Sequence, residues 1–298
     1  MDVRALLDQW NLQPSKGLGQ NFITDQAALA KIVAAAELTP DDIVLEVGAG
    51  LGTLTRRLAR KAGHVVAVEL DQRLMPVLQS VLSDMDNVTL IQGDILALDP
   101  ATLVNAASIE HRASSIQHLA SSIEPPASSL QYKVVANLPY YITSAVLRHL
   151  LEASLKPQRM VLTVQREVAE RIVAQPGQMS LLAVSVQFYG RPRRLFRIKP
   201  GSFFPSPSVE SAVVRVDLHA TPPVHAEDTG VFFRVVRAGF AQRRKQLRNG
   251  LAAGLGRSPQ EVAAKLTAAG VDPRRRAQTL SLEEWTRVTR ALGDLSDR

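Results

Sequence analysis

Short apolar runs alternate with segments of helical periodicity along most of the chain, from about residue 26 to residue 218. The apolar runs predict buried strands, and they are DIVLEVGAG, HVVAVELD, VTLIQGDIL, KVVANLPYY, RMVLTVQ, LLAVSVQFYG and SAVVRVDLH. The periodic segments predict helices at residues 26–38 and within LTRRLARKA, RLMPVLQSVL and REVAERI. Because strands alternate with helices, the pattern predicts an α/β fold with a parallel sheet covered by helices on both faces.

Two segments interrupt this alternation. Residues 100–131 are rich in Ser and Ala and contain Pro125 and Pro126, so we expect a surface insertion that is partly helical or disordered, and we assign it no function. Residues 220–228, ATPPVHAED, have the composition of a linker, and helical patterns follow them to the end of the sequence. The predicted organisation is therefore an α/β domain over residues 1–220 and a small all-helical domain over residues 229–298.

The composition excludes several classes of protein. Of the 298 residues 46% are hydrophobic, and no apolar run approaches the roughly 20 residues of a membrane-spanning helix. The chain has no Cys, and its six His have no ligand-like spacing, so the sequence predicts neither a disulfide nor a metal site. The N-terminal segment has early acidic residues and lacks the apolar core of a signal peptide. We expect a cytoplasmic protein that does not contact a membrane.

Positive charge is concentrated in the helical region. Residues 230–298 contain 14 Lys and Arg and 6 Asp and Glu, a net charge of +8, whereas the preceding 229 residues contain 21 basic and 22 acidic residues. Such an asymmetry indicates a polyanionic partner, and nucleic acid is the simplest one. The alternative is that the surplus Arg residues serve solubility.

A glycine-rich turn follows the first predicted strand, in the sequence LEVGAGLGTLT. Gly48 and Gly50 allow a ligand to approach the backbone, and the following helix N-terminus offers free N–H groups. Glu69 ends the next strand, 21 positions after Gly48, where a carboxylate can accept hydrogen bonds from both hydroxyls of a ribose. The spacing G-x-G-x-G differs from that of dinucleotide sites and favours S-adenosylmethionine over NAD as the cofactor. The alternative is a glycine-rich turn without a ligand.

A second acidic residue, Asp94, ends the third predicted strand. Its carboxylate can accept a hydrogen bond from an exocyclic amine such as that of adenine, although Asp is equally common as a helix N-cap. Three consecutive strands thus end in a glycine-rich turn, an acid and an acid. Because ligands of open α/β sheets bind outside the carboxyl ends of strands, this grouping indicates a cofactor site.

The fourth predicted strand ends in the sequence NLPY, which combines two hydrogen-bond acceptors with an aromatic ring. The Asn137 side-chain oxygen and the Leu138 carbonyl can accept hydrogen bonds, and Pro139 fixes the backbone that carries them. The ring of Tyr140 offers a face on which a base can stack. Two acceptors on an aromatic amine would direct its lone pair toward an electrophilic methyl group. The alternative is a β-turn with a packed Tyr.

Further along the chain, Phe203 and Phe204 lie in a proline-stiffened loop, GSFFPSPSVES, that can provide a second aromatic surface, although loop phenylalanines more often pack onto the core. The segment before it, GRPRRLFRIKP, is predicted to be a connector whose cations can hold phosphates near a flipped base. These cations are Arg191, Arg193, Arg194, Arg197 and Lys199.

One continuous helix is predicted over residues 231–251, VFFRVVRAGFAQRRKQLRNGL. At about 100° per residue, five cations fall on one arc of this helix beside an apolar arc. We expect these cations to contact the RNA backbone, the alternative being a solvated basic face. They are Arg234, Arg237, Arg244, Lys245 and Arg248.

These motifs together resemble one known family, the ribosomal RNA adenine-N6,N6-dimethyltransferases, and most closely its branch that acts on small-subunit (16S) rRNA. The resemblance covers nearly the whole chain. It is carried in order by GQNFITD (19–25), LEVGAGLGTLT (45–55), VELD (68–71), GDIL (93–96), NLPYYIT (137–143), FFPSPSVESAVV (203–214) and FAQRRKQLRNGL (240–251). It implies a seven-stranded, Rossmann-like class I methyltransferase domain followed by a small all-helical domain.

The resemblance also implies roles for individual residues. The segment with Gln20, Asn21 and Ile23 would fold over S-adenosylmethionine. The other positions that match cofactor contacts of the family are Gly48, Gly50, Glu69, Asp94 and Asn137. The positions that match the site for the target adenine are Asn137, Leu138, Pro139, Tyr140 and Phe204. The insertion near residues 100–131 departs from the family pattern, in which the spacing from GD to NLPY is usually shorter.

The predicted function is dimethylation of two adjacent adenosines near the 3′ end of small-subunit rRNA, within a precursor of the small ribosomal subunit, by a monomeric enzyme. Two alternatives stay open. One is a large-subunit rRNA methyltransferase of the macrolide-resistance type. The other is a non-catalytic RNA-binding assembly factor with the same fold, against which the intact Asn137 and Tyr140 argue.

Overall fold

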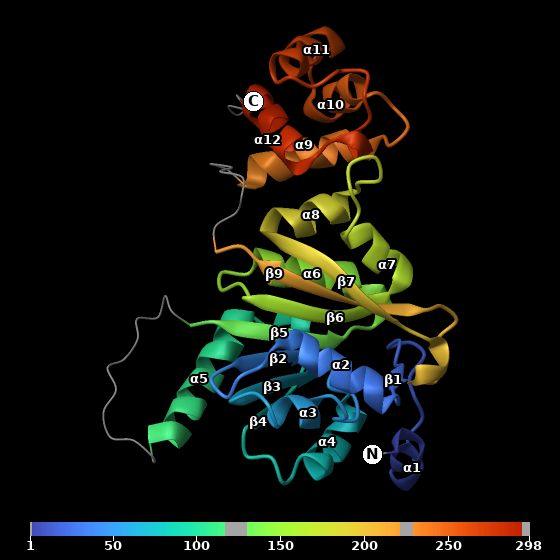
Figure 1. Ribbon diagram of the computed structural model, residues 1–298, viewed down its shortest axis with the longest axis vertical. Coiled ribbons are helices and arrows are strands. Elements are labelled where there is room, and N and C mark those ends of the chain that lie inside the picture. Colours follow the sequence, from blue (N-terminus) through green and yellow to red (C-terminus); the bar gives the residue numbers. More distant parts are fainter. Residues whose placement is uncertain (1, 117–129, 221–228, 294–298) are drawn as a thin grey trace. The chain divides into compact units, whose positions relative to one another are not determined.

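The computed structural model describes residues 2–116, 130–220 and 229–293 (Figure 1). Its strands are β1 (Phe22–Ile23), β2 (Ile43–Val47), β3 (His64–Glu69), β4 (Val88–Gln92), β5 (Tyr132–Asn137), β6 (Arg159–Gln165), β7 (Gly190–Ile198), β8 (Phe203–Phe204) and β9 (Ser211–Leu218). Its α-helices are α1 (Val3–Gln9), α2 (Gln26–Ala36), α3 (Thr55–Ala59), α4 (Met75–Val81), α5 (Pro100–Ile116), α6 (Thr143–Glu152), α7 (Arg166–Ile172), α8 (Leu181–Tyr189), α9 (Thr229–Ala241), α10 (Leu247–Leu255), α11 (Pro259–Ala268) and α12 (Leu282–Leu292).

Seven strands form the main sheet in the order β4-β3-β2-β5-β6-β9-β7. The pairs β3–β4, β2–β3, β2–β5 and β5–β6 are parallel, and β9 is antiparallel to β6. The strand order reverses between β2 and β5, so the carboxyl ends of these strands border the crevice where open α/β sheets bind ligands. The predicted α/β fold with a seven-stranded sheet is confirmed.

Apolar residues on the sheet and its helices explain this arrangement. Val44, Val65 and Val135 lie in one core cluster with Leu29 and Ile32 of α2. In Figure 1, α2 and α3 lie in front of the sheet, and α5 packs against β2 and β3. The central strands β2, β3, β5 and β6 are buried almost throughout, which is typical of parallel strands with covered faces and explains their near-continuous apolar runs.

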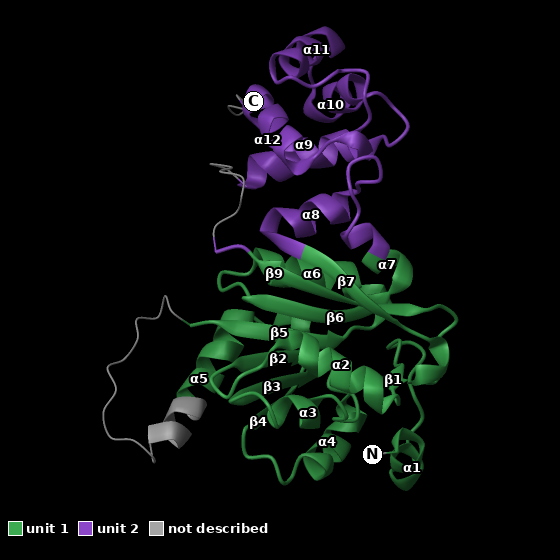
Figure 2. Ribbon diagram, viewed as in Figure 1, with its two compact units in different colours: residues 1–169, 192–218 green, residues 170–191, 219–298 purple. Residues whose placement is uncertain are grey.

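Two compact units make up the chain (Figure 2). Unit 1 contains residues 1–169 and 192–218, and unit 2 contains residues 170–191 and 219–298. Residues 170–191, which the sequence predicts to be part of the α/β domain, belong instead to unit 2. The reason is packing within unit 2, because the ring of Phe188 in α8 packs against that of Phe232 in α9 with centroids 4.7 Å apart.

Residues 181–198 differ from their predicted secondary structure. LLAVSVQFYG forms helix α8 rather than a strand, and the predicted connector that follows forms strand β7, at the edge of the sheet. Most of α8 is buried, so its sequence is apolar on nearly all sides and carries no clear period. Its N-cap was the available signal, since Ser180 Oγ accepts a hydrogen bond from the Ala183 N–H at 3.2 Å.

The predicted helix 231–251 is two helices, α9 and α10. In a continuous helix the Leu247 N–H would bond to the carbonyl four residues earlier. Instead it donates to the Arg275 carbonyl at 2.7 Å, and the Arg248 N–H donates to the Pro273 carbonyl at 3.2 Å. These bonds redirect the chain, so the five predicted cations do not share one helix face.

The insertion is described only in part. Helix α5 covers residues 100–116, which confirms the helical part of the prediction. The prediction for residues 117–129 lies outside the described residues. In unit 2, Trp285 of α12 is fully buried and its ring lies against α9, where a Cβ on Gly239 would be 2.4 Å from it. Glycine at position 239 therefore allows α9 and α12 to pack closely.

Candidate active site

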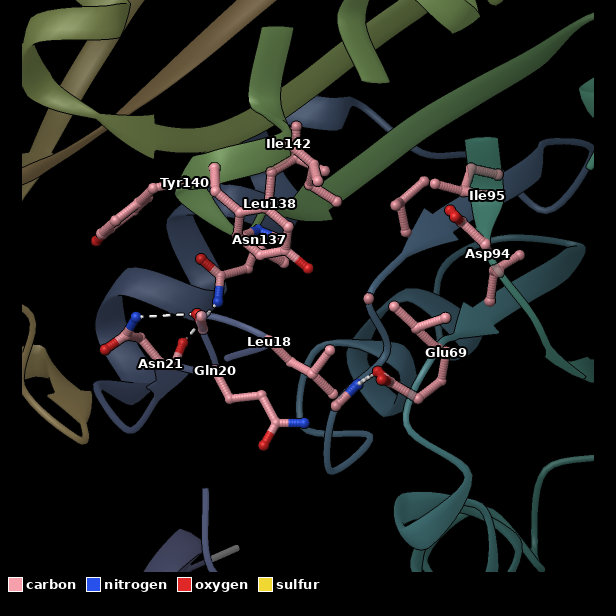
Figure 3. A pocket seen from close by; sticks show the side chains of 18 of the residues that line it. Leu18, Gln20, Asn21, Glu69, Asp94, Ile95, Asn137, Leu138, Tyr140 and Ile142 are labelled. Carbon is pink, nitrogen blue, oxygen red and sulfur yellow. Dashed lines mark hydrogen bonds between the residues drawn. The ribbon is translucent and has the colours of Figure 1, made fainter. Parts of the chain in front are cut away.

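A pocket opens at the carboxyl ends of β2, β3, β4 and β5, where the sequence predicted a ligand (Figure 3). It encloses about 750 Å³ of space, open solvent included. Most of the predicted site residues line it, namely Gln20, Asn21, Gly48, Gly50, Glu69, Asp94, Asn137, Leu138, Pro139 and Tyr140. Gly48, Glu69, Asp94 and Asn137 meet because parallel strands end at the same edge, whereas Gln20 and Asn21 reach the pocket from the segment before β1.

The glycine-rich turn after β2 has the backbone geometry that requires glycine. Gly48 and Gly50 have φ values of 76° and 60°. A Cβ on Gly48 would point into the pocket, 3.8 Å from the Asn137 carbonyl oxygen and 4.0 Å from Pro139. The turn therefore leaves space beside Asn137 that any larger residue would fill.

Glu69 is tied to this turn. Its Oε2 accepts a hydrogen bond from the Gly50 N–H at 2.8 Å, and its Oε1 accepts one from the Asp71 N–H at 2.8 Å. The side chain is buried, and burial raises the pKa of its carboxyl, against the opposing effect of these two bonds. Each oxygen keeps a second lone pair, so the carboxylate is held in a fixed orientation and can still accept bonds from a diol.

A second buried acid, Glu46, lies two residues before Gly48. It is 1% exposed, and its Oε2 has no hydrogen-bond partner among the described residues. Burial, together with the charge of Glu69, raises the pKa of Glu46 to about 8. The carboxyl is therefore predominantly protonated at neutral pH, and it does not line the pocket.

Asp94 is a helix N-cap that also lines the pocket. Its Oδ1 accepts a hydrogen bond from the Leu96 N–H at 2.9 Å and so caps a 3₁₀-helix, η2 (Ile95–Ala97). The side chain is exposed and lines the pocket. Because the cap uses Oδ1, Oδ2 can accept a hydrogen bond from a ligand.

The amide of Asn137 is oriented by a distant segment. Its Nδ2 donates to the Asn21 carbonyl at 2.9 Å, and Asn21 Nδ2 in turn donates to the Gly19 carbonyl at 3.0 Å (Figure 3). This bond uses one of the two N–H groups of the Asn137 amide and sets the orientation of the side chain. Its Oδ1 is the group left to accept a hydrogen bond from a molecule in the pocket.

The NLPY turn is held by hydrogen bonds to the neighbouring strands. The Leu138 N–H donates to the Thr163 carbonyl of β6 at 3.2 Å. The Tyr140 hydroxyl and Ser211 Oγ of β9 are 2.7 Å apart and share a hydrogen bond. Burial raises the pKa of Tyr140, which the bond with Ser211 partly offsets, so the phenol stays neutral. These contacts fix the ring that lines the pocket.

Gln20 has a structural role besides lining the pocket. Its Nε2 donates to Asp71 Oδ2 at 2.8 Å, and its Oε1 accepts from the Ser15 N–H at 2.7 Å. Hydrogen bonds from Arg73 and Gln20 lower the pKa of Asp71, with that of Arg73 the larger. Gln20 thus fastens the N-terminal segment to the loop after β3.

Two predicted residues, Ile23 and Phe204, are not among those that line the pocket. Ile23 is buried in β1, which pairs with β8 in a small antiparallel sheet. Phe204 pairs with Phe22 in that sheet, and the Arg4 guanidinium lies 4.8 Å from the centre of its ring. In this structure Phe204 therefore packs against the N-terminal helix α1.

The pocket also has lining residues that the sequence analysis did not single out, among them Leu18, Ile95 and Tyr141. Tyr141 is 59% exposed, and its ring lies close to Gly19, where a Cβ would be 3.3 Å away. The doubled tyrosine in NLPYY was the available signal for it. Nothing local distinguishes Leu18 or Ile95 from ordinary apolar residues.

The five predicted RNA-binding cations all lie in unit 2. Arg234 and Arg237 are exposed on α9, Arg244 and Lys245 are exposed in the turn after it, and Arg248 is half-buried in α10. Over residues 2–116, 130–220 and 229–293, there is no cluster of His, Asp and Glu that could hold a metal ion. None of the helices in these same ranges is long and apolar enough to cross a membrane.

Comparison with known proteins places the chain. The family model for ribosomal RNA adenine dimethylase matches residues 11–294. A protein of Dehalococcoides mccartyi (strain CBDB1) named ribosomal RNA small subunit methyltransferase A is 44% identical over 286 residues, which are 96% of this chain and 91% of the relative. A protein of the same name from Moorella thermoacetica is 41% identical over 97% of this chain and 96% of the relative.

Solved structures agree with the fold. The 23S rRNA methyltransferase ErmE matches with a TM-score of 0.68 and 27% identity, over 92% of this chain and 100% of ErmE. A dimethyladenosine transferase from Plasmodium falciparum matches with a TM-score of 0.67 and 21% identity, over 90% of this chain and 95% of the other. The family match spans both units and every strand of the pocket, and on this basis the chain belongs to the ribosomal RNA adenine dimethylase family.

Proposed function

We propose that this protein transfers methyl groups from S-adenosylmethionine to N6 of two adjacent adenosines near the 3′ end of small-subunit rRNA, giving dimethyladenosines. Family membership and the names of its relatives support this function. The observation that carries it is the orientation of the Asn137 amide, whose Nδ2 bonds to the Asn21 carbonyl and whose Oδ1 is left for the pocket. An acceptor in that position suits an amine substrate.

The pocket residues fit the proposed cofactor. When bound, S-adenosylmethionine supplies an electrophilic methyl group on a sulfonium ion. Glu69 would accept bonds from the ribose hydroxyls and Asp94 one from the adenine amine. Gly48 leaves the space beside Asn137 that a side chain would fill. The segment with Gln20, Asn21 and the Ile23 backbone would cover the ligand, held there by the bonds from Gln20 and to Asn21.

Asn137 and Leu138 would bind the target amine. Their oxygens would accept the two N–H groups of adenine N6, and this pairing turns the nitrogen lone pair out of conjugation with the ring. Asn137 and Leu138 would thus present the lone pair to the methyl carbon that the cofactor would supply, with the cofactor sulfur as the leaving group. No strong base is needed, because the alkylated nitrogen is acidic and loses its extra proton readily. After the first transfer the nitrogen retains one N–H for the second cycle.

Tyr140 would hold the base by stacking, worth about 1–3 kcal/mol for a nucleobase on an aromatic ring. Its ring orientation is set in advance by the hydroxyl bond to Ser211. Pro139 keeps the turn rigid, so little conformational entropy is lost on binding. A stacking role for Phe204 stays a prediction that requires its ring to leave the position beside Arg4.

The substrate context is also part of the proposal. We infer that a monomer in the cytoplasm acts on rRNA assembled in a precursor of the small subunit. Arg234, Arg237, Arg244, Lys245 and Arg248 would contact RNA phosphates, and the net charge of +8 in residues 230–298 favours such contacts.

Methylation of isolated subunits tests the function. Small subunits from cells that lack the modification are incubated with the protein and methyl-labelled S-adenosylmethionine, and the rRNA is then mapped by mass spectrometry. The expected product is two adjacent dimethyladenosines near the 3′ end. Because ErmE is a structural relative, large-subunit RNA is assayed in parallel. Methylation of large-subunit RNA alone would refute the proposal, and methylation of neither would favour a non-catalytic assembly factor.

A further inference from the structure

Unit 2 contains a hollow outside the active site. It lies where the loop between α7 and α8 meets the end of α9 and a 3₁₀-helix, η6 (Ala277–Thr279). It holds about 530 Å³ of space, open solvent included. Its polar lining consists of Arg171, Gln178, Ser180, Arg243 and Gln278.

The charge in the hollow is entirely positive. Arg171 and Arg243 are both exposed, and neither has an ion-pair partner within the described part of unit 2. None of the residues that line the hollow is acidic. Two guanidinium groups at one hollow, without a carboxylate, form a site for an anion, and the planar donor fork of Arg suits a phosphate.

The walls of the hollow are fixed before any ligand binds. The N–H groups of Gly177 and Met179 both donate to the Gln278 carbonyl, at 2.9 and 3.1 Å. These bonds join the α7–α8 loop to η6. Ser180 caps α8 at the same place, which keeps the end of this loop in one conformation. Binding in a preformed hollow costs little ordering of the protein.

The hollow also has an aromatic wall and two amides. Phe240 lines it, and this half-buried ring packs against Trp285 at a centroid distance of 5.6 Å. Gln178 and Gln278 each offer a donor and an acceptor. An aromatic surface, amides that can read a base edge and cations for phosphate are the groups that recognise an unstacked nucleotide of single-stranded RNA.

We propose that this hollow binds one unpaired, unstacked nucleotide of the RNA substrate, with its phosphate on Arg171 and Arg243 and its base against Phe240. The site is separate from the target-adenine pocket of unit 1, and it also differs from the five cations already assigned to backbone contact. It would anchor unit 2 on a bulged or looped nucleotide. The inference rests on the proposed function only in requiring an RNA substrate.

Binding and kinetics of two single variants test the proposal. Arg171→Ala and Arg243→Ala are compared with Arg290→Ala, which removes an exposed Arg of unit 2 that does not line the hollow. For each hollow variant we expect a five- to tenfold weaker affinity for small subunits. The slope of log affinity against log salt should fall by about 1, and the single-turnover rate at saturating subunits should be unchanged. The proposal fails if the hollow variants match Arg290→Ala in affinity and salt slope.

Crosslinking tests the nucleotide directly. A photoreactive phenylalanine analogue replaces Gln178 in the full-length protein, which is irradiated on small subunits. Crosslinks confined to one unpaired nucleotide support the site, whereas crosslinks spread over paired nucleotides, or none, overturn it. Wild-type methylation of small-subunit rRNA is measured in the same preparations. Its absence would refute the proposed function, whereas normal wild-type methylation with unaffected hollow variants would refute this inference alone.

Discussion

At the end of the sheet where β5 and β6 begin, polar side chains bind one another, whereas at the end where β5 stops they are left available to a ligand. Lys133, at the start of β5, is 6% exposed, and its Nζ donates to Asp42 at 2.9 Å and to the Glu37 carbonyl at 2.8 Å. Beside it, Arg159 pairs with Asp217 at 2.6 Å and with Glu37 at 2.7 Å. Because internal ion pairs satisfy its polar groups, this end is called the closed end.

Hydrogen-bond acceptors dominate the other end, where β5 stops and the pocket lies, and this end is called the open end. Glu69, Asp94 and Asn137 each form at least one hydrogen bond with the backbone, and each has an oxygen or a lone pair that can still accept a hydrogen bond from a ligand. The pKa values show the same contrast. Hydrogen bonds from Arg215 and Arg159 lower the pKa of Glu37 to about 2, whereas burial raises the pKa values of Glu46 and Glu69.

The contrast separates stability from function within one sheet. Groups that satisfy one another stabilise the fold and have no capacity left for chemistry. Groups that are oriented by the backbone but incompletely bonded are ready for a substrate, at some cost in stability. Substitutions at the two ends should therefore affect different measurements, and this is the expectation to be tested.

The largest effect is expected from Asn137→Ala at the open end. It removes the oxygen that would bind the target amine, so the single-turnover rate of methyl transfer should fall on the order of 10²- to 10³-fold. The free energy of unfolding should change by only about 1 kcal/mol, since one hydrogen bond to the Asn21 carbonyl is lost. Asn105→Ala, at an exposed position of α5, is the control and should behave as wild type. An unchanged rate for Asn137→Ala would remove the basis of the proposed function.

Lys133→Met at the closed end should lower the free energy of unfolding and leave the rate of methyl transfer unchanged. It leaves Asp42 and the Glu37 carbonyl without their partner, and breaking such a buried pair costs about 3 kcal/mol. Urea denaturation measures this loss, and Lys61→Met, at an exposed position, should lose no more than about 0.5 kcal/mol. At a temperature where the variant is folded, its single-turnover rate should equal that of wild type. A large loss of rate in folded Lys133→Met would show that the two ends are not independent.

Glu46 gives a smaller, pH-dependent effect. Its pKa is about 8 in the folded protein and about 4.5 in the unfolded chain. Between these values the folded state holds a proton that the unfolded state has lost, so this group makes stability fall as pH rises, by at most about 1.4 kcal/mol per pH unit. Glu46→Gln removes that slope. The Tm of Glu46→Gln minus the Tm of wild type should therefore increase from pH 5.5 to pH 7.5.

A matched exposed substitution controls for the rest of the pH dependence. Glu152→Gln, on α6, should leave the slope of Tm against pH as in wild type. If Glu46→Gln keeps the wild-type slope as well, then Glu46 is ionised at neutral pH and the open end does not contain a neutral buried acid.

The same contrast explains what could be predicted from the sequence. Glu69, Asp94 and Asn137 were identified from the sequence because each ends an apolar run that predicts a strand. In each case the residue at that end has a side chain that can bind a ligand. The role of Asn21 in fixing the Asn137 amide was not identified, since the two residues are 116 positions apart and only the fold brings them together. The ion pairs of Lys133 and Arg159 were missed for the same reason.

The errors in secondary structure have a similar origin. Helix α8 is apolar on most sides because α9 and α12 also pack against it, so its sequence does not show a helical period. The break between α9 and α10 depends on hydrogen bonds to residues 273–275, which the local sequence does not reveal. The local sequence therefore predicted the elements whose burial follows a regular period. Where tertiary contacts determine the conformation, as in α8 and between α9 and α10, it did not.

The smallest effect is expected for the hydrogen bond between Tyr140 and Ser211, which holds a ring of the pocket in place. Tyr140→Phe keeps the ring for stacking but loses the 2.7 Å hydrogen bond to Ser211, which is worth about 0.5–1.5 kcal/mol, or a two- to tenfold lower single-turnover rate. Ser211→Ala should lower the rate by the same factor. The double variant should be no slower than either single one, because both substitutions remove one interaction. Additive losses in this cycle would show that Tyr140 uses its hydroxyl on the substrate rather than for positioning its ring.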